Sequence, residues 1–263
     1  MKSCIVTSSD SRYLEGVRAL FFSIRSRMPD LEFVLFAHGD KEDFKEFESL
    51  PKCRVLYNEE TIYSPTSNEW PVELPAMYSR LLMTKLLGGE FDRCLWIDAD
   101  AVALEDLTPL LEMDMQGQPV AGCLCHDPNK PDDPLNFLPF QFEDPMDAKG
   151  YGTTKAIQAG VYLVDNKKWK ELNLDQRIND ILTSGPVFKF VVQGVLGLAL
   201  ENRFTNIDIK WNCKQGDERW NTKEVSIYHY VGKDVCNPWL GNCHAPEYWK
   251  VHRDGYRNLY EIF

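Results

Sequence analysis

The stretch Cys94-Leu95-Trp96-Ile97-Asp98-Ala99-Asp100-Ala101-Val102-Ala103-Leu104 decides which class of fold this chain adopts. Its first four residues are apolar and predict a buried strand, and two aspartates follow one residue apart. Side chains alternate at period two in an extended chain, so both carboxylates would point the same way. Open α/β sheets bind ligands at the carboxyl ends of their strands. The pair therefore marks either a solvated turn or a divalent-cation site at a sheet edge.

The remainder of the chain alternates between strand-like and helix-like segments. In the first half, β-prone runs cover residues 3–7, 33–37 and 54–57, and apolar residues recur at helical spacing over 13–24, 42–50 and 75–87. This alternation implies a parallel α/β sheet. In the second half we expect strands over 119–125, 159–164 and 226–231, and helices that begin at Lys167 and cover 188–200. Residues 126–152 predict a long irregular loop, and loops of that length are usually functional.

Composition excludes several classes of protein. The 263 residues fit one large domain or two small ones, and 44% hydrophobic with 26% charged residues is ordinary for a globular protein. The net charge of −11 argues against nucleic-acid and anionic-membrane binding. No apolar stretch reaches the length of a membrane span, and the N-terminus lacks the apolar core of a signal peptide. We therefore expect a cytoplasmic protein without a membrane span.

The eight cysteines predict a reduced chain rather than a metal knuckle. Several lie inside apolar runs and are typical of small buried hydrophobic residues. No Cys-x-x-Cys pair occurs, which disfavours a structural zinc site. Cys236 and Cys243 share a loop rich in glycine and proline, and they could pair in an oxidising setting.

Further short motifs accompany the aspartate pair, and their order along the chain is distinctive. They are Ile5-Val6-Thr7-Ser8-Ser9-Asp10 with Tyr13, Tyr78-Ser79-Arg80-Leu81 with Lys85, Gln158-Ala159-Gly160 with Trp169, and His229-Tyr230-Val231-Gly232 with Pro238-Trp239. Together with Asp98 and Asp100 they resemble glycosyltransferase family 8, the retaining nucleotide-sugar transferases that include glycogenin and bacterial galactosyltransferases. The resemblance spans Ile5 to Trp239 and is far more specific than one Asp-x-Asp pair.

The resemblance implies a fold and a set of ligands. The fold would be one GT-A domain over residues 1–263, with a mostly parallel sheet flanked by helices. Residues 1–105 would form the nucleotide-binding half, and residues 106–263 the acceptor half and C-terminal segment. Asp98, Asp100 and His229 would ligate Mn²⁺ (or Mg²⁺), since carboxylate oxygens suit a hard cation. The donor substrate would be a UDP-sugar.

The resemblance also implies roles for residues around the metal. The nucleoside would lie against Thr7, Ser8, Asp10 and Tyr13. The residues expected to contact the rest of the donor are Arg80, Ala99, Gln158, Gly160, Gly232 and Lys233. The residues expected to take part in catalysis are Gln193, Arg80 and Lys85. The aromatic residues Phe137, Phe140 and Phe142 of the long loop form a hypothetical platform for the acceptor.

The chain departs from the family pattern at three places. Gln158 stands where the family has asparagine, and Asn237 stands before Pro238 where a lysine is expected, with Lys233 the nearest replacement cation. Val192 precedes Gln193 where the family has an aspartate that binds hydroxyls of the donor sugar. A valine cannot accept those hydrogen bonds, so this change should alter or relax the choice of donor.

Two other functions compete with the glycosyltransferase hypothesis. One is a GT-A-like domain that binds nucleotide or glycan without turnover. The other is a haloacid-dehalogenase-like phosphatase, in which Asp98 would be a nucleophile beside Mg²⁺. That signature normally lies on the first strand of its domain, whereas several strands precede Asp98 here. The sequence leaves open whether the acceptor is a glycan, a lipid or a protein, which sugar is donated, and the oligomeric state.

Overall fold

The computed structural model describes most of the chain. The described residues are 1–57, 75–127, 129–142, 144, 146–147, 149–184, 186–214, 222, 224–231 and 246–260. The predictions for Gly232, Lys233, Asn237, Cys236 and Cys243 lie outside these residues.

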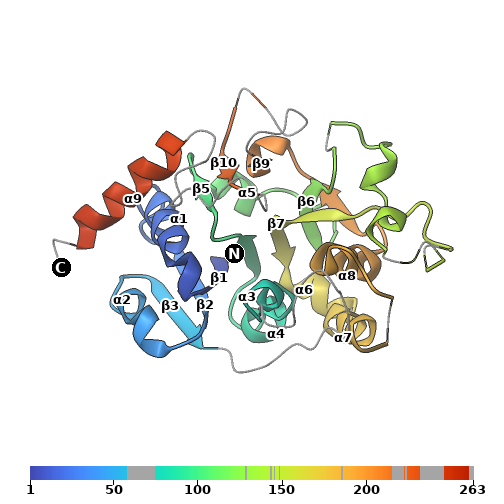
Figure 1. The fold of residues 1–263 in the computed structure, drawn as a ribbon, viewed down its shortest axis with the longest axis horizontal. Helices are drawn as coiled ribbons and strands as arrows, with labels where there is room; N and C mark the ends of the chain where they lie inside the picture. Colours follow the sequence, from blue (N-terminus) through green and yellow to red (C-terminus); the bar gives the residue numbers. More distant parts are fainter. Residues whose placement is uncertain are drawn as a thin grey trace.

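A seven-stranded sheet forms the centre of the molecule (Figure 1). Its strands are β1 (Ser3–Asp10), β2 (Glu32–His38), β3 (Cys53–Tyr57), β4 (Arg93–Ile97), β6 (Val120–Leu124), β7 (Ile157–Asp165) and β8 (Phe204–Asn206), in the spatial order β3-β2-β1-β4-β7-β6-β8. All neighbouring strands pair in parallel except β7, which is antiparallel to both β4 and β6. The expected mostly parallel α/β sheet is confirmed.

Helices cover both faces of this sheet, which explains why its strands are near-continuous apolar runs. One face packs against α1 (Leu14–Arg25), α2 (Lys45–Glu48), α5 (Thr108–Leu111) and α9 (Pro246–Tyr260). The other packs against α3 (Pro75–Tyr78), α4 (Met83–Leu87), α6 (Asn166–Glu171), α7 (Leu174–Ser184) and α8 (Val191–Leu200). Alternation along β1 illustrates the division, because Val6 joins the second core and Ile5 the first.

A second, three-stranded sheet leaves the carboxyl edge of the first and was not predicted as such. It consists of β5 (Ala101–Ala103), β10 (Ile227–His229) and β9 (Cys213–Lys214), in the order β5-β10-β9. Strand β10 lies within the strand expected over 226–231, whereas β5 and β9 are too short for a periodic signal. This small sheet continues directly from the aspartate pair, so it determines what lies next to those carboxylates.

Two expected segments are more broken than their patterns suggest. The helix expected over 75–87 is divided into α3, a 3₁₀ turn at Ser79–Leu81 and α4, and the helix over 42–50 is a 3₁₀ turn at Lys41–Phe44 followed by α2. The 126–152 segment holds two 3₁₀ turns, Pro134–Asn136 and Leu138–Gln141, rather than a helix or strand.

The side chain of Asn136 organises the start of the 126–152 loop. It is fully buried, and its Oδ1 accepts hydrogen bonds from the backbone N–H groups of His126 and Asp127. The hypothetical acceptor platform is wrong for Phe142, which is 1% exposed and packs against Tyr151 and Phe188. Phe142 contributes to the hydrophobic core instead of a ligand surface.

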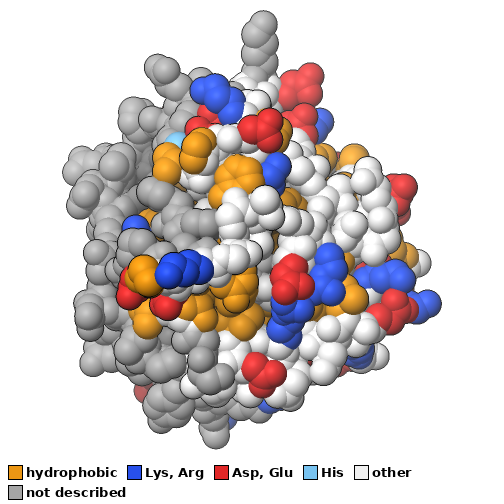
Figure 2. Space-filling view, turned by 90° about the vertical axis from the view of Figure 1, so that its right-hand side faces the viewer, with side chains coloured by type: hydrophobic (Ala, Val, Ile, Leu, Met, Phe, Trp, Pro, Cys, Tyr) orange, Lys and Arg blue, Asp and Glu red, His pale blue; other side chains and the backbone are white. Residues whose placement is uncertain are grey.

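The surface and the cysteines agree with the compositional expectations. In the part of the chain that the structure describes, no helix is long and apolar enough to cross a membrane. On the face in Figure 2, Lys and Arg side chains are interspersed with Asp and Glu side chains. Six cysteines lie among the described residues, and all six are free thiols.

We expect Leu163 on β7 to be a major contributor to stability. It is fully buried in the strand between β4 and β6, so Leu163→Ala should lower the free energy of unfolding by about 2–5 kcal/mol through lost burial and a residual cavity. The measurement is urea unfolding followed by far-UV circular dichroism. Leu86→Ala is the matched control, because Leu86 is 36% exposed and should cost less. Equal losses for the two variants would contradict this account of the core.

Candidate active site

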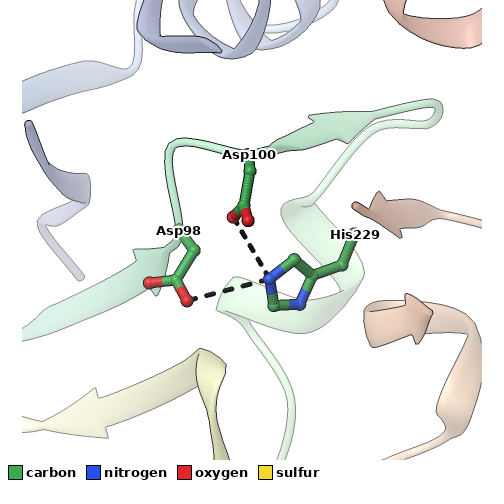
Figure 3. Close-up of side chains that lie close together, drawn as sticks. All are labelled: Asp98, Asp100 and His229. Atoms are coloured by element: carbon green, nitrogen blue, oxygen red, sulfur yellow. Dashed lines mark ion pairs between the residues drawn. The ribbon is translucent and has the colours of Figure 1, made fainter. Parts of the chain in front are cut away.

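Two strands far apart in the sequence bring together three side chains that could hold a metal ion. Asp98 follows the last residue of β4, and Asp100 precedes the first residue of β5. Strand β10 pairs antiparallel with β5 so that His229 lies opposite Ala101, and the backbone N–H of Tyr230 donates to the carbonyl of Asp100 at 2.8 Å. This register places the His229 ring beside both carboxylates, and Figure 3 shows the three side chains pointing toward one another.

The distances within this group suit a single bound cation. His229 Nε2 lies 3.2 Å from Asp100 Oδ1 and 3.7 Å from Asp98 Oδ2. One ligand atom from each residue lies within 4.8 Å of the others. The His229 side chain is 1% exposed, whereas each aspartate is 20% exposed, so a ligand can reach the carboxylates from solvent.

The carboxylates converge through a turn rather than an extended strand. Strand β4 ends at Ile97, residues 99 and 100 form a turn, and the N–H of Ala101 donates to the carbonyl of Asp98 at 3.1 Å. The two carboxylates therefore converge because of this turn. The expectation that an extended chain would align them is wrong. Ala99, between them, is buried, whereas both aspartates are partly exposed.

Asp98 is held from one side by an arginine and a tryptophan. Arg80 Nη2 lies 2.9 Å from Asp98 Oδ1, and Trp96 Nε1 donates to the same oxygen at 2.8 Å. Burial raises the pKa of Asp98, and the neighbouring Asp100 adds to the rise, while Arg80 and His229 oppose it. A cation between the two aspartates would favour the ionised carboxylates.

Arg80 is itself fixed in place by contacts on several sides. Its Nε donates to the carbonyl of Met77 at 2.9 Å, its Nη1 donates to the carbonyl of Ala159 at 2.6 Å, and its guanidinium lies 5.0 Å from the centre of the Trp96 ring. Its own carbonyl accepts a hydrogen bond from the Tyr162 hydroxyl. The Arg80 charge is therefore positioned before any ligand binds.

A second set of hydrogen bonds supports His229 from behind. His229 Nδ1 lies 2.8 Å from Asn212 Oδ1, and Asn212 Nδ2 donates to Gln158 Oε1 at 2.7 Å. The same oxygen accepts from the backbone N–H of Gly160 at 2.6 Å. Gln158 therefore uses its carbonyl oxygen within the protein and retains only its amide nitrogen for a ligand.

Gly160 contacts two of the three metal-binding residues. Its carbonyl accepts the backbone N–H of Asp98 at 2.8 Å, and a Cβ at this position would lie 2.1 Å from Cε1 of His229. Such a distance is impossible for carbon atoms, so any side chain here would displace the imidazole. Glycine is required because a ring approaches its backbone.

A pocket of about 150 Å³ opens beside Asp98. Its lining residues are Met77, Arg80, Asp98, Gln158, Ala159, Gly160, Phe190, Val191, Val192 and Gln193. Five of them were predicted site residues, although they come from four separate segments of the sequence. Gln193 lies in the first turn of α8, and its Oε1 is 3.0 Å from the thiol sulfur of Cys125.

The predicted nucleoside-binding residues lie at the carboxyl end of β1. Thr7 is fully buried, and its hydroxyl has no hydrogen-bond partner among the described residues. The Ser8 hydroxyl donates to the carbonyl of Ala76. Asp10 caps the following 3₁₀ turn by accepting from the N–H of Arg12 at 2.9 Å, and Tyr13 precedes α1. Both readings of Asp10, helix cap and ligand contact, remain compatible with this position.

The remaining predicted residues are less central. Lys85 is exposed on α4, beyond Arg80, and is not among the residues that line the pocket. Gly232 and Lys233 lie outside the described residues. No sequence motif indicated Asn212, because its partners are 17 and 54 residues away. Trp96 could have been found, since it lies two residues before Asp98 and faces the same side.

The donor set fits a divalent metal ion. Two carboxylates and one imidazole are ligands that Mn²⁺ and Mg²⁺-type sites use, with the imidazole favouring the transition metal. In the described part of the chain, His229 Nε2 is a buried nitrogen without hydrogen-bond geometry to any partner. Such an atom is costly in the protein interior unless something binds it, so the residues present fit a cation held at Nε2.

Comparison with known proteins gives one family across most of the chain. The family described as "Glycosyl transferase family 8" matches residues 4–243. The lipopolysaccharide 1,2-glucosyltransferase of Escherichia coli is 27% identical over 255 residues, which cover 88% of this chain and 70% of that protein.

Solved structures share the fold at low sequence identity. An active-site mutant of LgtC has a TM-score of 0.72 at 16% identity and covers 95% of both chains. The galactosyltransferase LgtC in complex with donor and acceptor sugar analogues has a TM-score of 0.67 at the same identity and coverage. The bifunctional enzyme WbbM has a TM-score of 0.71 at 16% identity. The match covers 96% of this chain but only 49% of WbbM. These likenesses confirm the GT-A fold.

We predict that Gly160→Ala removes the metal-binding arrangement while the fold persists. The added methyl group must push the His229 ring away from Asp98 and Asp100, so affinity for Mn²⁺ should fall by about tenfold or more. Electron paramagnetic resonance of free Mn²⁺ during a titration measures this affinity. Gly89→Ala is the control, because a Cβ there has no atom within 4 Å. Equal affinity in both variants would show that His229 is not a ligand.

Proposed function

The chain belongs to glycosyl transferase family 8, and from this premise we propose that it transfers a sugar from a UDP-sugar to a glycan, lipid or protein acceptor. The proposed reaction depends on Mn²⁺ (or Mg²⁺) and retains the configuration of the anomeric carbon. The observation that carries the proposal is the convergence of Asp98, Asp100 and His229 at the carboxyl edge of the sheet.

Asp98, Asp100 and His229 would hold the cation. When bound, a divalent cation supplies positive charge to a diphosphate, which lowers the energy of its departure. Asp98 lines the pocket and both carboxylates are partly exposed, so the diphosphate would approach from the exposed side. The buried His229 would bind from the opposite side, anchored by its contacts in the small sheet.

Arg80 would stabilise the negative charge that develops on the leaving UDP. Its guanidinium is planar and permanently charged, and it lines the pocket next to Asp98. Contacts with Met77, Ala159 and Trp96 hold it in position, so little reorganisation is required when charge develops. Lys233, with Gly232, would contact the phosphates from the segment that follows β10, and Lys85 would add positive charge nearby.

The nucleoside would lie at the carboxyl end of β1. Strand β1 is parallel to β4 and next to it in the sheet, so Asp10, the last residue of β1, and Asp98, which follows β4, lie at the same edge. Binding at that edge is the general rule for open α/β sheets. Asp10 and Tyr13 would contact the base and ribose, and the buried Thr7 and Ser8 would line the same turn.

The donor sugar would enter the pocket between Arg80 and α8. Gln193 would lie by the anomeric carbon, with the amide nitrogen of Gln158 on the other side. The neighbouring wall is apolar, because Met77, Val191 and Val192 also line the pocket. Apolar side chains cannot accept hydrogen bonds from sugar hydroxyls, so this wall favours a donor whose hydroxyls bind other groups. Val192, which stands where the family has an aspartate, is part of this wall.

The anomeric configuration would be retained if the acceptor hydroxyl attacked the sugar from the same face that UDP leaves. No side chain that the structure describes in the pocket, apart from the metal-binding Asp98, carries a carboxylate able to act as a nucleophile. The acceptor hydroxyl would attack the anomeric carbon as the bond to the phosphate oxygen breaks, and that departing oxygen would take the hydroxyl proton. The product and UDP would then both be released.

The first test is ligand-dependent stability. In saturating Mn²⁺, UDP at about 100 times its dissociation constant should stabilise the fold by about 2.7 kcal/mol over Mn²⁺ alone, and thermal unfolding would show it as a higher melting temperature. The combined Asp98→Asn and Asp100→Asn variant should lose the shift. Asp254→Asn, on the exposed side of α9, should keep it. A shift with UDP alone, unchanged by Mn²⁺ or by the double variant, would contradict the proposed metal dependence.

The second test addresses the stereochemistry. Once a screen of UDP-sugars and acceptors identifies a productive pair by UDP release, proton NMR of the first product should show the anomeric configuration of the donor. Retention is expected because attack and departure occur on one face. A first product of inverted configuration would exclude this route. Stabilisation by UDP–Mn²⁺ without turnover on any pair would instead favour a binding domain.

A further inference from the structure

Behind His229, a series of hydrogen bonds has donors and acceptors that the geometry determines. This series runs through Gly160, Gln158, Asn212 and His229. The last three residues are buried, with exposed fractions of 7%, 0% and 0%. Side-chain amides and imidazole rings can each be turned over, so their donors and acceptors are normally assigned rather than seen. Here the series of hydrogen bonds begins at the backbone N–H of Gly160, which cannot be turned over.

The backbone N–H of Gly160 determines the orientation of both amides. It points at the Gln158 side chain at 2.6 Å, so the atom that meets it must be the carbonyl oxygen. The Asn212 atom 2.7 Å from that oxygen must then be the amide nitrogen, because two oxygens would repel. The other end of the Asn212 amide is therefore its oxygen, and this oxygen faces His229 Nδ1 at 2.8 Å.

An oxygen at this place can only accept a hydrogen bond, so Nδ1 must carry a proton. A neutral imidazole holds one proton, which leaves Nε2 with its lone pair. Nε2 is the atom that faces Asp98 and Asp100. The two carboxylates alone would draw a proton onto Nε2, and Nε2–H has no lone pair to offer a cation. The amides behind the ring oppose that tautomer.

We propose that Gln158 and Asn212 are positioning residues that fix His229 in the Nδ1–H tautomer, so that Nε2 is available as a metal ligand. The part that concerns metal binding rests on the proposed function, whereas the tautomer itself does not. This assignment gives Gln158 a role within the protein: both lone pairs of its carbonyl oxygen are used by Gly160 and Asn212.

The tautomer can be observed directly in the metal-free protein. Long-range ¹H–¹⁵N NMR of ¹⁵N-histidine-labelled full chain distinguishes Nδ1–H from Nε2–H rings, at a pH where each ring carries one proton. The chain has five histidines, and the signal of His229 is the one lost in His229→Gln. We expect the wild-type ring to be Nδ1–H.

Two substitutions at Asn212 separate hydrogen bonding from packing. Asn212→Leu has a similar shape and no acceptor, so the proton should move to Nε2, and the affinity for Mn²⁺ should fall by about 10–100-fold. Asn212→Asp can still accept from Nδ1–H, so it should keep the tautomer and Mn²⁺ affinity, while the loss of the donor to Gln158 Oε1 should lower the melting temperature of this variant. Gln158→Met, which removes the acceptor for Asn212 Nδ2, should give a mixture of tautomers, and it serves if Asn212→Leu does not fold.

The outcomes separate the inference from the proposed function. An Nε2–H ring in the wild type overturns the inference, as does an unchanged tautomer in both folded Asn212→Leu and Gln158→Met. A wild type with the Nδ1–H ring but no Mn²⁺ binding, with or without UDP, overturns the metal site and leaves the tautomer assignment standing. A tautomer change without loss of Mn²⁺ affinity overturns the role of the two residues in binding.

Discussion

The site depends on the antiparallel pairing of β10 with β5. That pairing sets His229 opposite Ala101 and ties Tyr230 to the carbonyl of Asp100, so the histidine of the proposed metal site is held by backbone hydrogen bonds. A slip of one residue would turn His229 to the other face of the strand and replace it with Tyr228 or Tyr230. The fit of both neighbouring tyrosines into the apolar cluster with Trp249 resists such a slip.

Two half-buried carboxylates in one place would ordinarily destabilise a fold, and the surrounding structure compensates for them. Asp98 receives Arg80 and Trp96 on one oxygen, while His229 faces the other. Arg80 and His229, which stabilise the carboxylates, are also proposed to bind the donor and the metal. Trp96 contacts Arg80 and so helps to hold it in place. The same constraint explains Gly160, whose lack of a side chain admits the imidazole.

The sequence predicted the local features of this molecule and missed the long-range ones. Apolar runs located β1, β2, β3, β4, β6 and β7, because a buried strand needs a continuous apolar signal. The motif comparison singled out Asp98, Asp100 and His229, and the structure brings them together, while Arg80, Gln158, Gly160 and Gln193 share the adjoining pocket. Asn212 was missed because its only signal is contact with residues remote in sequence. Phe142 was misassigned because an aromatic residue in a polar loop gives no sign of whether it faces solvent or core.

The packing of α9 against α1 has a consequence for the order in which the protein can assemble. Gly255 on α9 admits the ring of Phe22 on α1, so the last described helix completes the surface of the first. His229 likewise reaches back 129 residues to Asp100. During synthesis at the ribosome, residues 1–105 therefore emerge with neither the helix that covers α1 nor His229, the third member of the proposed metal site. Because such distant contacts form late, the proposed catalytic centre would be among the last parts to be completed, and a nascent chain carries the aspartate pair well before His229 can join it.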